Sequence, residues 1–321
     1  MKRTGLAVMI VLLASPLAHS EMEATRTTLR EHVLKLINRD RQIYNLPPVE
    51  LDLDTSVMGD AYCAEQIRTG SSGHYGTDGL SPYMRYSFHG GNDGVSENAA
   101  AWSASYSFSE RALYEMSRRS QDAMMAEMPP KDGHKKTILD PHATHVGIGM
   151  AWNGGEFRLV HEFIRRYVQW TRTLPRQART TDLPMIAGRP LHGTTIEAIS
   201  VHYERMPETM PASVASAIDS YSLPSKRKEY FPRLKQEYKR SPDGTLEITR
   251  REYANGHRGD FYVGKQGEFA FAIPFTEGAG LYTVVVWVKR PGFEKPVAAS
   301  NVSVRVEESL QTPVRASATG R

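Results

Sequence analysis

The chain has 321 residues and a formal charge of +4, and 40% of its residues are hydrophobic. This composition is typical of a globular protein long enough for two domains. The single cysteine, Cys63, excludes an intrachain disulfide. No arginine–aromatic interleaving of the kind that binds single strands is present, so we expect no nucleic-acid partner.

The first twenty residues are typical of a secretory signal peptide. Lys2 and Arg3 precede a short apolar run, and Ala18-His19-Ser20 has small residues where a signal peptidase cleaves. Cleavage there makes Glu21 the first mature residue and lowers the formal charge to +2, because Lys2 and Arg3 are removed. An uncleaved N-terminal anchor is the alternative. No later segment is long and apolar enough to span a bilayer. We predict a secreted or periplasmic protein without a transmembrane segment after cleavage.

Two helices are expected next. Residues 25–44 carry apolar residues at helical spacing, and Pro47-Pro48 ends this pattern. Asp54 is expected to cap a second helix that runs to about Arg68. Its inward face is predicted to hold Val57, Ala61, Ala64 and Ile67, with Cys63 as a small buried residue. Residues 70–96 are rich in glycine, serine and aspartate and predict a long, functional loop.

A third helix is expected to start at Ser107 or Ser109 and to end near Met128, before Pro129-Pro130. Two strands, residues 144–152 and 157–167, are expected around the turn Asn153-Gly154-Gly155.

The second half of the chain changes character. Residues 171–190 contain three prolines among threonines and arginines, which predicts a linker. Beyond it, apolar residues alternate in strand fashion, for example at Phe269, Phe271 and Ile273 and at Tyr282, Val284, Val286 and Val288. We predict an immunoglobulin-like β-sandwich. Residues 220–238 have no clear pattern.

These observations divide the chain into predicted segments. They are a signal peptide (1–20), an α+β domain (21–170), a linker (171–190), an all-β sandwich domain (191–308) and a disordered tail (309–321).

His74, Glu97, Glu127 and His134 are the candidate functional residues. Two imidazoles and two carboxylates suffice for a divalent metal site, with His74 and His134 as ligands, or for acid/base work by the glutamates. Glu127 is preferred to Glu110 and Glu115 because it continues the apolar stripe of Leu113, Met116, Ser120 and Ala123, which lies beside Met124. A carboxylate on an inward face is costly unless something pairs with it. His89, His142, His145 and His161 are the competing histidines.

The local frames of these residues resemble the CAP superfamily of secreted proteins, which comprises cysteine-rich secretory, antigen 5 and plant pathogenesis-related proteins, in its bacterial form. The fingerprints are Asn38-Arg39 with Leu46-Pro47-Pro48, Glu97-Asn98, Gly133-His134 and Val146-Gly147-Ile148-Gly149. Their order covers about residues 25–170. The resemblance implies an α-β-α sandwich, and the spacing from His134 to Gly147 supports His134. The chain departs from the family in lacking disulfides and in the short spacer from Glu127 to His134.

Two functions follow as hypotheses. The resemblance implies a secreted, non-enzymatic binding protein, whose cleft holds a divalent ion, with Zn²⁺ as candidate, beside a lipid, a peptide or a partner in the cell envelope. The alternative is a metal-assisted hydrolase, in which two imidazoles hold Zn²⁺ and Glu97 or Glu127 is the general base. Against the hydrolase, no nucleophile or oxyanion donor can be named from the sequence, so the residues favour binding.

Overall fold

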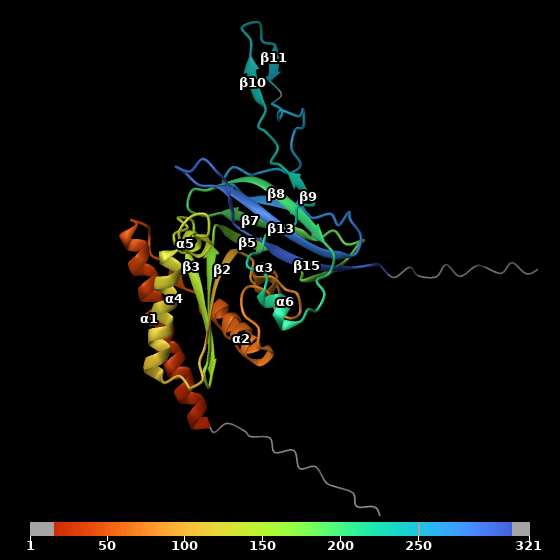
Figure 1. The fold of residues 1–321 in the computed structure, drawn as a ribbon. Helices are drawn as coiled ribbons and strands as arrows, with labels where there is room; N and C mark the ends of the chain where they lie inside the picture. The colour runs from red at the N-terminus through yellow and green to blue at the C-terminus, as the bar shows by residue number, and fades with distance from the viewer. Residues whose placement is uncertain (1–15, 250, 310–321) are drawn as a thin grey trace, which may run out of the picture.

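The computed structural model describes residues 16–249 and 251–309. Most of the proposed signal peptide and nearly all of the proposed tail lie outside these residues. Residues 16–20, which the sequence assigns to the signal, form the start of the first helix. The described chain forms an α/β region up to about residue 167 and a β-rich region after it (Figure 1).

The first region contains a mixed sheet between helices. Its elements are α1 (Pro16–Ile43), β1 (Glu50–Leu51), α2 (Leu53–Thr69), α3 (Pro82–Phe88), β2 (Gly94–Ser103), α4 (Glu110–Ala126), α5 (Gly133–Ile138), β3 (His145–Asn153) and β4 (Glu156–Arg165). The strand order is β1-β3-β4-β2, in which β1 runs parallel to β3 and the other pairs are antiparallel.

Helices cover both faces of this sheet. Ile148, Met150 and Leu159 pack in one core with residues of α1 and α4, whereas Ala151 and Val160 pack with Tyr62 and Cys63 of α2. Figure 1 shows α1 and α4 on the opposite side of the sheet from α2. The alternation of side chains along each strand produces these two cores. The predicted three-layer arrangement and the buried, unpaired Cys63 are therefore confirmed.

The buried face of α2 was predicted wrongly except at Ile67, which is half-buried and packs beside Tyr62 and Cys63. Val57 is 55% exposed, and Ala61 and Ala64 are exposed as well. The buried face instead holds Met58, Tyr62, Cys63 and Gln66. Gly59 faces Gly149 so closely that a Cβ on Gly149 would lie 2.3 Å from the Gly59 Cα. This glycine contact, which apolar periodicity cannot reveal, selects the face; the cap is Asp52 rather than Asp54.

Residues 70–96 are less irregular than expected. Ser81-Pro82 begins α3, with proline in the first turn where its missing N–H costs nothing. The segment then enters β2 at Gly94. Glu97, which directly follows the segment predicted as a loop, therefore lies in a strand and is buried.

The second region packs sheets around an apolar core. Its elements are β5 (Val168–Arg172), β6 (Gln177–Arg179), β7 (Met185–Pro190), β8 (Thr195–Glu204), α6 (Ala212–Ser216), β9 (Arg227–Tyr230), β10 (Glu237–Arg240), β11 (Leu246–Thr249), β12 (Phe269–Ala272), β13 (Gly280–Lys289), β14 (Val297–Ala298) and β15 (Val302–Glu307). One sheet has the order β12-β7-β5, and another has the order β6-β15-β13-β8-β9, with β14 on β13.

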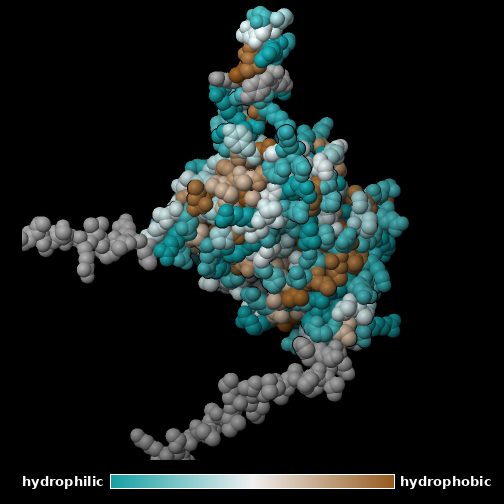
Figure 2. Space-filling model, turned by 180° about the vertical axis from the view of Figure 1, so that it is seen from behind, coloured by the Kyte–Doolittle hydropathy of each residue, from teal (hydrophilic) through white to brown (hydrophobic). Residues whose placement is uncertain are grey.

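The predicted alternation along β13 is confirmed, since Tyr282, Val284, Val286 and Val288 all lie in this core. The immunoglobulin-like assignment stays a prediction. The hairpin of β10 and β11 projects from the body (Figures 1 and 2), and its Leu246 and Ile248 are 54% and 47% exposed.

Residues 171–190 do not form a linker. They hold the end of β5 together with β6 and β7, and Leu174 and Ile186 are buried in the core of the second region. Pro175 and Pro184 lie between these strands and Pro190 ends β7, as expected for a residue that cannot donate to a sheet ladder. Proline content thus marked strand ends rather than an independent connector.

Candidate functional site

Helix α2 holds the loop that carries His74. Gly73 has a left-handed backbone (φ 86°), which favours glycine. Its carbonyl accepts hydrogen bonds from the Tyr62 hydroxyl at 2.9 Å and from Gln66 Nε2 at 2.8 Å. Two side chains one turn apart on α2 therefore fix the backbone next to His74, whose ring is 90% buried.

Strand β2 presents Glu97 to His74. Glu97 Oε1 lies 2.8 Å from His74 Nδ1, and Oε2 accepts a hydrogen bond from Arg85 Nη2 at 2.6 Å. Burial acts to raise the pKa of Glu97, but the Arg85 guanidinium and the His74 hydrogen bond bring that pKa below its ordinary value. Glu97 is therefore an ionised carboxylate with both oxygens occupied.

Arg85 was missed in the sequence. It is buried on α3, its Nη1 donates to the carbonyls of His74 and Leu80, and its guanidinium lies 3.4 Å from the centre of the Tyr62 ring. Burial lowers the pKa of Arg85, but the Glu97 carboxylate and other nearby groups raise it by more. The pKa therefore lies above its ordinary value. Arg85 thus fixes both Glu97 and the His74 backbone. A lone arginine in Pro82-Tyr83-Met84-Arg85 gave no signal of this role.

Glu127 and His134 form a second carboxylate–imidazole pair. Glu127 follows directly after α4, and its Oε1 lies 2.5 Å from His134 Nδ1. Its Oε2 accepts hydrogen bonds from the backbone N–H groups of His134 at 2.9 Å and Lys135 at 3.3 Å. The preference for Glu127 agrees with this geometry, since Glu115 pairs with Arg118 and Arg119 at the surface. The stripe argument was partly wrong, because Ala123 is exposed and Met124 is buried in its place.

The structure brings the four predicted residues together around one cleft. The His74 and His134 ring centres are 6.1 Å apart, with 33° between the ring planes. The cleft has a volume of about 740 Å³. Its walls come from the loop with Gly73 and His74, from β2, from the segment between α4 and the end of α5, and from the second region, where the end of α6 and the segment after it line the cleft.

The second region supplies part of the wall. Tyr221, within the stretch that the sequence left unassigned, accepts a hydrogen bond from the Glu97 backbone N–H at 2.5 Å. Its ring meets the His74 ring edge-on at 5.1 Å. Ser72 N donates to Ser216 Oγ at 3.0 Å. The cleft is therefore shared between both regions, and nothing in the pattern around Tyr221 indicated this.

Glu162 lies directly opposite Glu97 in the register of β4 against β2. It is fully buried, and no donor of the described residues hydrogen-bonds to either of its oxygens. Burial, and next the Glu97 carboxylate, raise its pKa well above the ordinary value. A protonated Glu162 can donate to Glu97, which leaves Arg85 facing one negative charge rather than two. The available signal was a histidine and a glutamate side by side in β4, between the apolar pairs Leu159-Val160 and Phe163-Ile164.

The competing histidines lie outside the cleft lining. His142 hydrogen-bonds to Arg290 and lies against Phe293, with the two ring planes tilted by 57°. His145 contacts Thr144 and Glu50. His89 is exposed after α3. His161 is fully buried, and neither ring nitrogen has a hydrogen-bond partner within the described chain. Burial, with a smaller effect of His134, lowers its pKa to about 3. We therefore assign no ligand role to these four.

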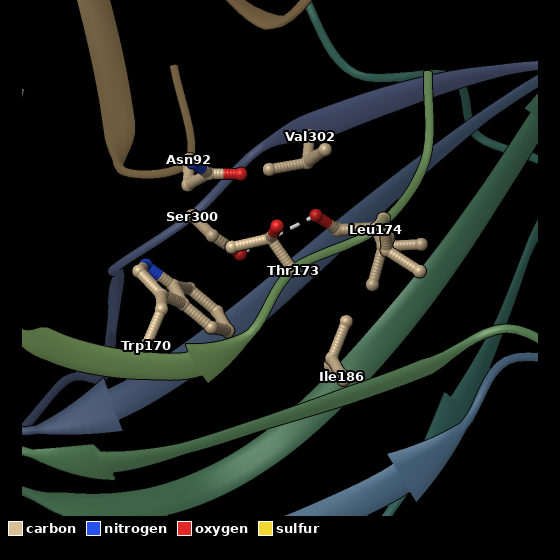
Figure 3. Close-up of a pocket in the computed structure, with 8 residues that line it drawn as sticks. Asn92, Trp170, Thr173, Leu174, Ile186, Ser300 and Val302 are labelled. Atoms are coloured by element: carbon tan, nitrogen blue, oxygen red, sulfur yellow. Dashed lines mark hydrogen bonds between the residues drawn. The ribbon is translucent and has the colours of Figure 1, made fainter. Parts of the chain in front are cut away.

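A crevice between Trp170, Leu174, Ile186 and Val302 lies at the second region (Figure 3). Its volume is about 10 Å³, enough for about one water molecule. It is too small for a ligand, so the shared cleft is the better candidate site.

Neither a metal-ligand cluster nor a membrane-spanning helix is found in residues 16–249 and 251–309. Within them, no group of three or more histidine, cysteine, aspartate or glutamate side chains is arranged to hold a metal ion. No helix in the same residues is long and apolar enough to cross a membrane.

Comparisons with known proteins gave a solved structure and a family model. A solved extracellular protein containing an SCP domain, from Bacillus anthracis str. Ames, is similar with 18% identity and a TM-score of 0.31 over 42% of this chain and 40% of its own. No curated protein matches the chain. Residues 34–163 match the model of the cysteine-rich secretory protein family, CAP. The first region of this protein is therefore a CAP domain.

Proposed function

We propose that this chain is an exported binding protein whose cleft holds a divalent metal ion, best matched by Zn²⁺, beside an organic ligand. His74 and His134 would bind the ion through their Nε2 atoms. The signal pattern of residues 1–20 supports export to the periplasm or the medium.

The donor set fits such an ion. Each imidazole hydrogen-bonds through Nδ1 to a carboxylate, which favours the tautomer with a free lone pair on Nε2. Metal–nitrogen distances of about 2.0–2.1 Å place two coordinating ring centres roughly 5–6 Å apart, close to the 6.1 Å found here. The bound ion would supply a Lewis-acidic centre for an oxygen or nitrogen atom of the ligand.

The hydrogen bonds of the Glu97 and Glu127 carboxylates are the observation that favours binding over hydrolysis. Glu97 is held by His74 and Arg85, and Glu127 is held by His134 and two backbone N–H groups. A general base must be within reach of the proton that it removes and must have a free lone pair there. Each of the four carboxylate oxygens already accepts a hydrogen bond, and each glutamate holds an imidazole Nδ1, so both glutamates are better suited to orienting the imidazoles than to removing a proton.

The volume and lining of the cleft limit the size and the polarity of the ligand. Its volume of about 740 Å³ suits a small molecule or a short segment of a larger partner. Polar side chains are prominent in its lining, namely Ser96, Asn98, Lys131, Thr137, Asp219 and Ser220. This lining favours a peptide or a partner in the cell envelope over a lipid tail.

Zinc titration by calorimetry tests the metal site. His74→Ala and His134→Ala are each expected to abolish tight zinc binding, whereas His145→Ala, outside the cleft, keeps it. Binding should weaken on acidification, because a protonated imidazole cannot ligate. Stoichiometric zinc in the His74/His134 double variant would refute the site. Peptide cleavage that vanishes in Glu97→Gln or Glu127→Gln with zinc retained would establish the hydrolase instead.

A further inference from the structure

Strand β2 is one of the two edges of the CAP-domain sheet and also a wall of the cleft. The strand order β1-β3-β4-β2 leaves one side of β2 without a neighbouring strand. Ser96, Glu97, Asn98 and Ala99 of β2 line the cleft. An edge strand presents backbone N–H and C=O groups that another chain can pair with. The cleft therefore runs past an unpaired sheet edge.

The outward backbone groups of β2 can be identified. The Glu97 N–H points away from β4, because it donates to Tyr221. In an antiparallel strand, outward groups recur at every second residue, so those of Ala99 and Ala101 also point outward. Ala99 is half-buried and Ala101 is exposed. No hydrogen bond to the N–H of either alanine is found within the described residues.

At Val95, near the start of β2, a side chain of the second region makes the hydrogen bonds that a neighbouring strand would make. The Asn301 side-chain amide accepts from Val95 N at 3.2 Å and donates to Val95 O at 3.0 Å. It thus makes both bonds that a paired peptide would make. Tyr221 covers the next outward position, Glu97. The next outward backbone group, that of Ala99, has no such partner in the described chain and faces the cleft.

We propose that the open edge of β2 from Ala99 to Ala101 binds an extended peptide segment by β-strand addition, alongside the histidine pair. The inference rests on the proposed function, because it names the ligand of the same cleft. Two outward N–H groups two residues apart, about 7 Å along a strand, match the acceptor spacing of another strand. A lipid tail has no acceptor for them, and a buried unpaired amide is costly.

Proline substitution tests the edge. Ala99→Pro and Ala101→Pro remove an outward N–H without breaking the ladder to β4, and edge strands tolerate proline there. Ala101→Val is the matched control, since it keeps the N–H. The probe is a twelve-residue peptide selected on the zinc-loaded full chain from a phage-displayed random library. We expect each proline variant to lower its affinity roughly tenfold or more, with zinc stoichiometry unchanged, and Ala101→Val to weaken it much less than Ala101→Pro does.

An N-methyl scan of the selected peptide gives a second measurement that does not depend on folding of a variant. Methylation should weaken binding at alternate positions only, because alternate amides of a strand point to its neighbour. A scan without alternation, or no peptide selected above background while zinc still binds, overturns strand addition but leaves the metal site standing. Zinc retained in the His74/His134 double variant overturns the proposed function instead. Phosphatidylcholine vesicles that bind in place of peptide would identify a lipid ligand and also contradict strand addition.

Discussion

The two regions of this protein bury different kinds of side chain. The CAP region buries Arg30, Arg41, Arg85, Glu97 and Glu162, together with His161. Among the described residues from Val168 onward, no lysine, arginine, aspartate or glutamate is buried, and valine, isoleucine and aromatic side chains fill the core. Buried ion pairs contribute little net stability, because desolvation offsets their attraction. The CAP region therefore has a core suited to holding a site, whereas the second region has an apolar core and supplies one wall.

The largest expected effect comes from removing the cation of the site. Arg85→Met leaves the buried Glu97 carboxylate without its guanidinium and should lower the free energy of unfolding by about 3–5 kcal/mol. Zinc affinity should fall with it, because Glu97 no longer orients His74. Urea unfolding and zinc titration measure both effects. Arg118→Met, which breaks an exposed ion pair with Glu115, is the control and should leave both nearly unchanged. Equal effects of Arg85→Met and Arg118→Met would contradict the view that the buried arginine matters more than the exposed one.

An intermediate effect should appear as a pH dependence. The pKa of His161 is lowered to about 3, below the ordinary 6.5. As the pH falls below 6.5, the unfolded chain takes up a proton that the folded chain does not, so this residue makes stability fall on acidification. The loss from His161 should reach about 2 kcal/mol by pH 5.

His161→Leu should remove that part of the acid slope, as measured by urea unfolding between pH 7 and pH 5. The exposed His89, changed to leucine, is the control and should keep the full slope. An unchanged slope in His161→Leu would show that the buried imidazole does not control acid sensitivity.

The smallest effect is expected in the second region. Ile199 is fully buried in its apolar core, so Ile199→Val should cost about 0.5–1.5 kcal/mol. Because no charged group is involved, the cost should be the same at pH 5 and pH 7, and zinc binding should not change. A cost that varied with pH or altered zinc affinity would mean that the apolar core and the site are coupled.

Much of the fold could be predicted where one signal dominates. Apolar periodicity located α1 and α4, and Asn153-Gly154-Gly155 located the hairpin of β3 and β4. Alternation located β13. The prediction of the inward face of α2 was wrong, because the close approach of Gly59 and Gly149 selects this face rather than hydrophobicity. The prediction of a linker over residues 171–190 was wrong, because prolines occur at strand ends as readily as between domains.

The candidate site was predicted in part. The structure brings His74, Glu97, Glu127 and His134 together, as expected from their local frames. Arg85 and Tyr221 were not predicted, since a helical arginine and a tyrosine in an unpatterned stretch carry no local sign of a distant partner. Tyr221 reaches Glu97 across more than a hundred residues of chain.

The sequence by itself determined the types of residue available for the chemistry and the elements that carry them, because periodicity, capping and turn residues act over a few positions. Only the tertiary structure decided which carboxylates are already occupied, that Glu162 faces Glu97, and that β2 is an open edge closed in part by Asn301 and Tyr221. These features depend on strand order, on register and on packing between the regions. Such contacts join residues far apart in the chain, so no local pattern encodes them.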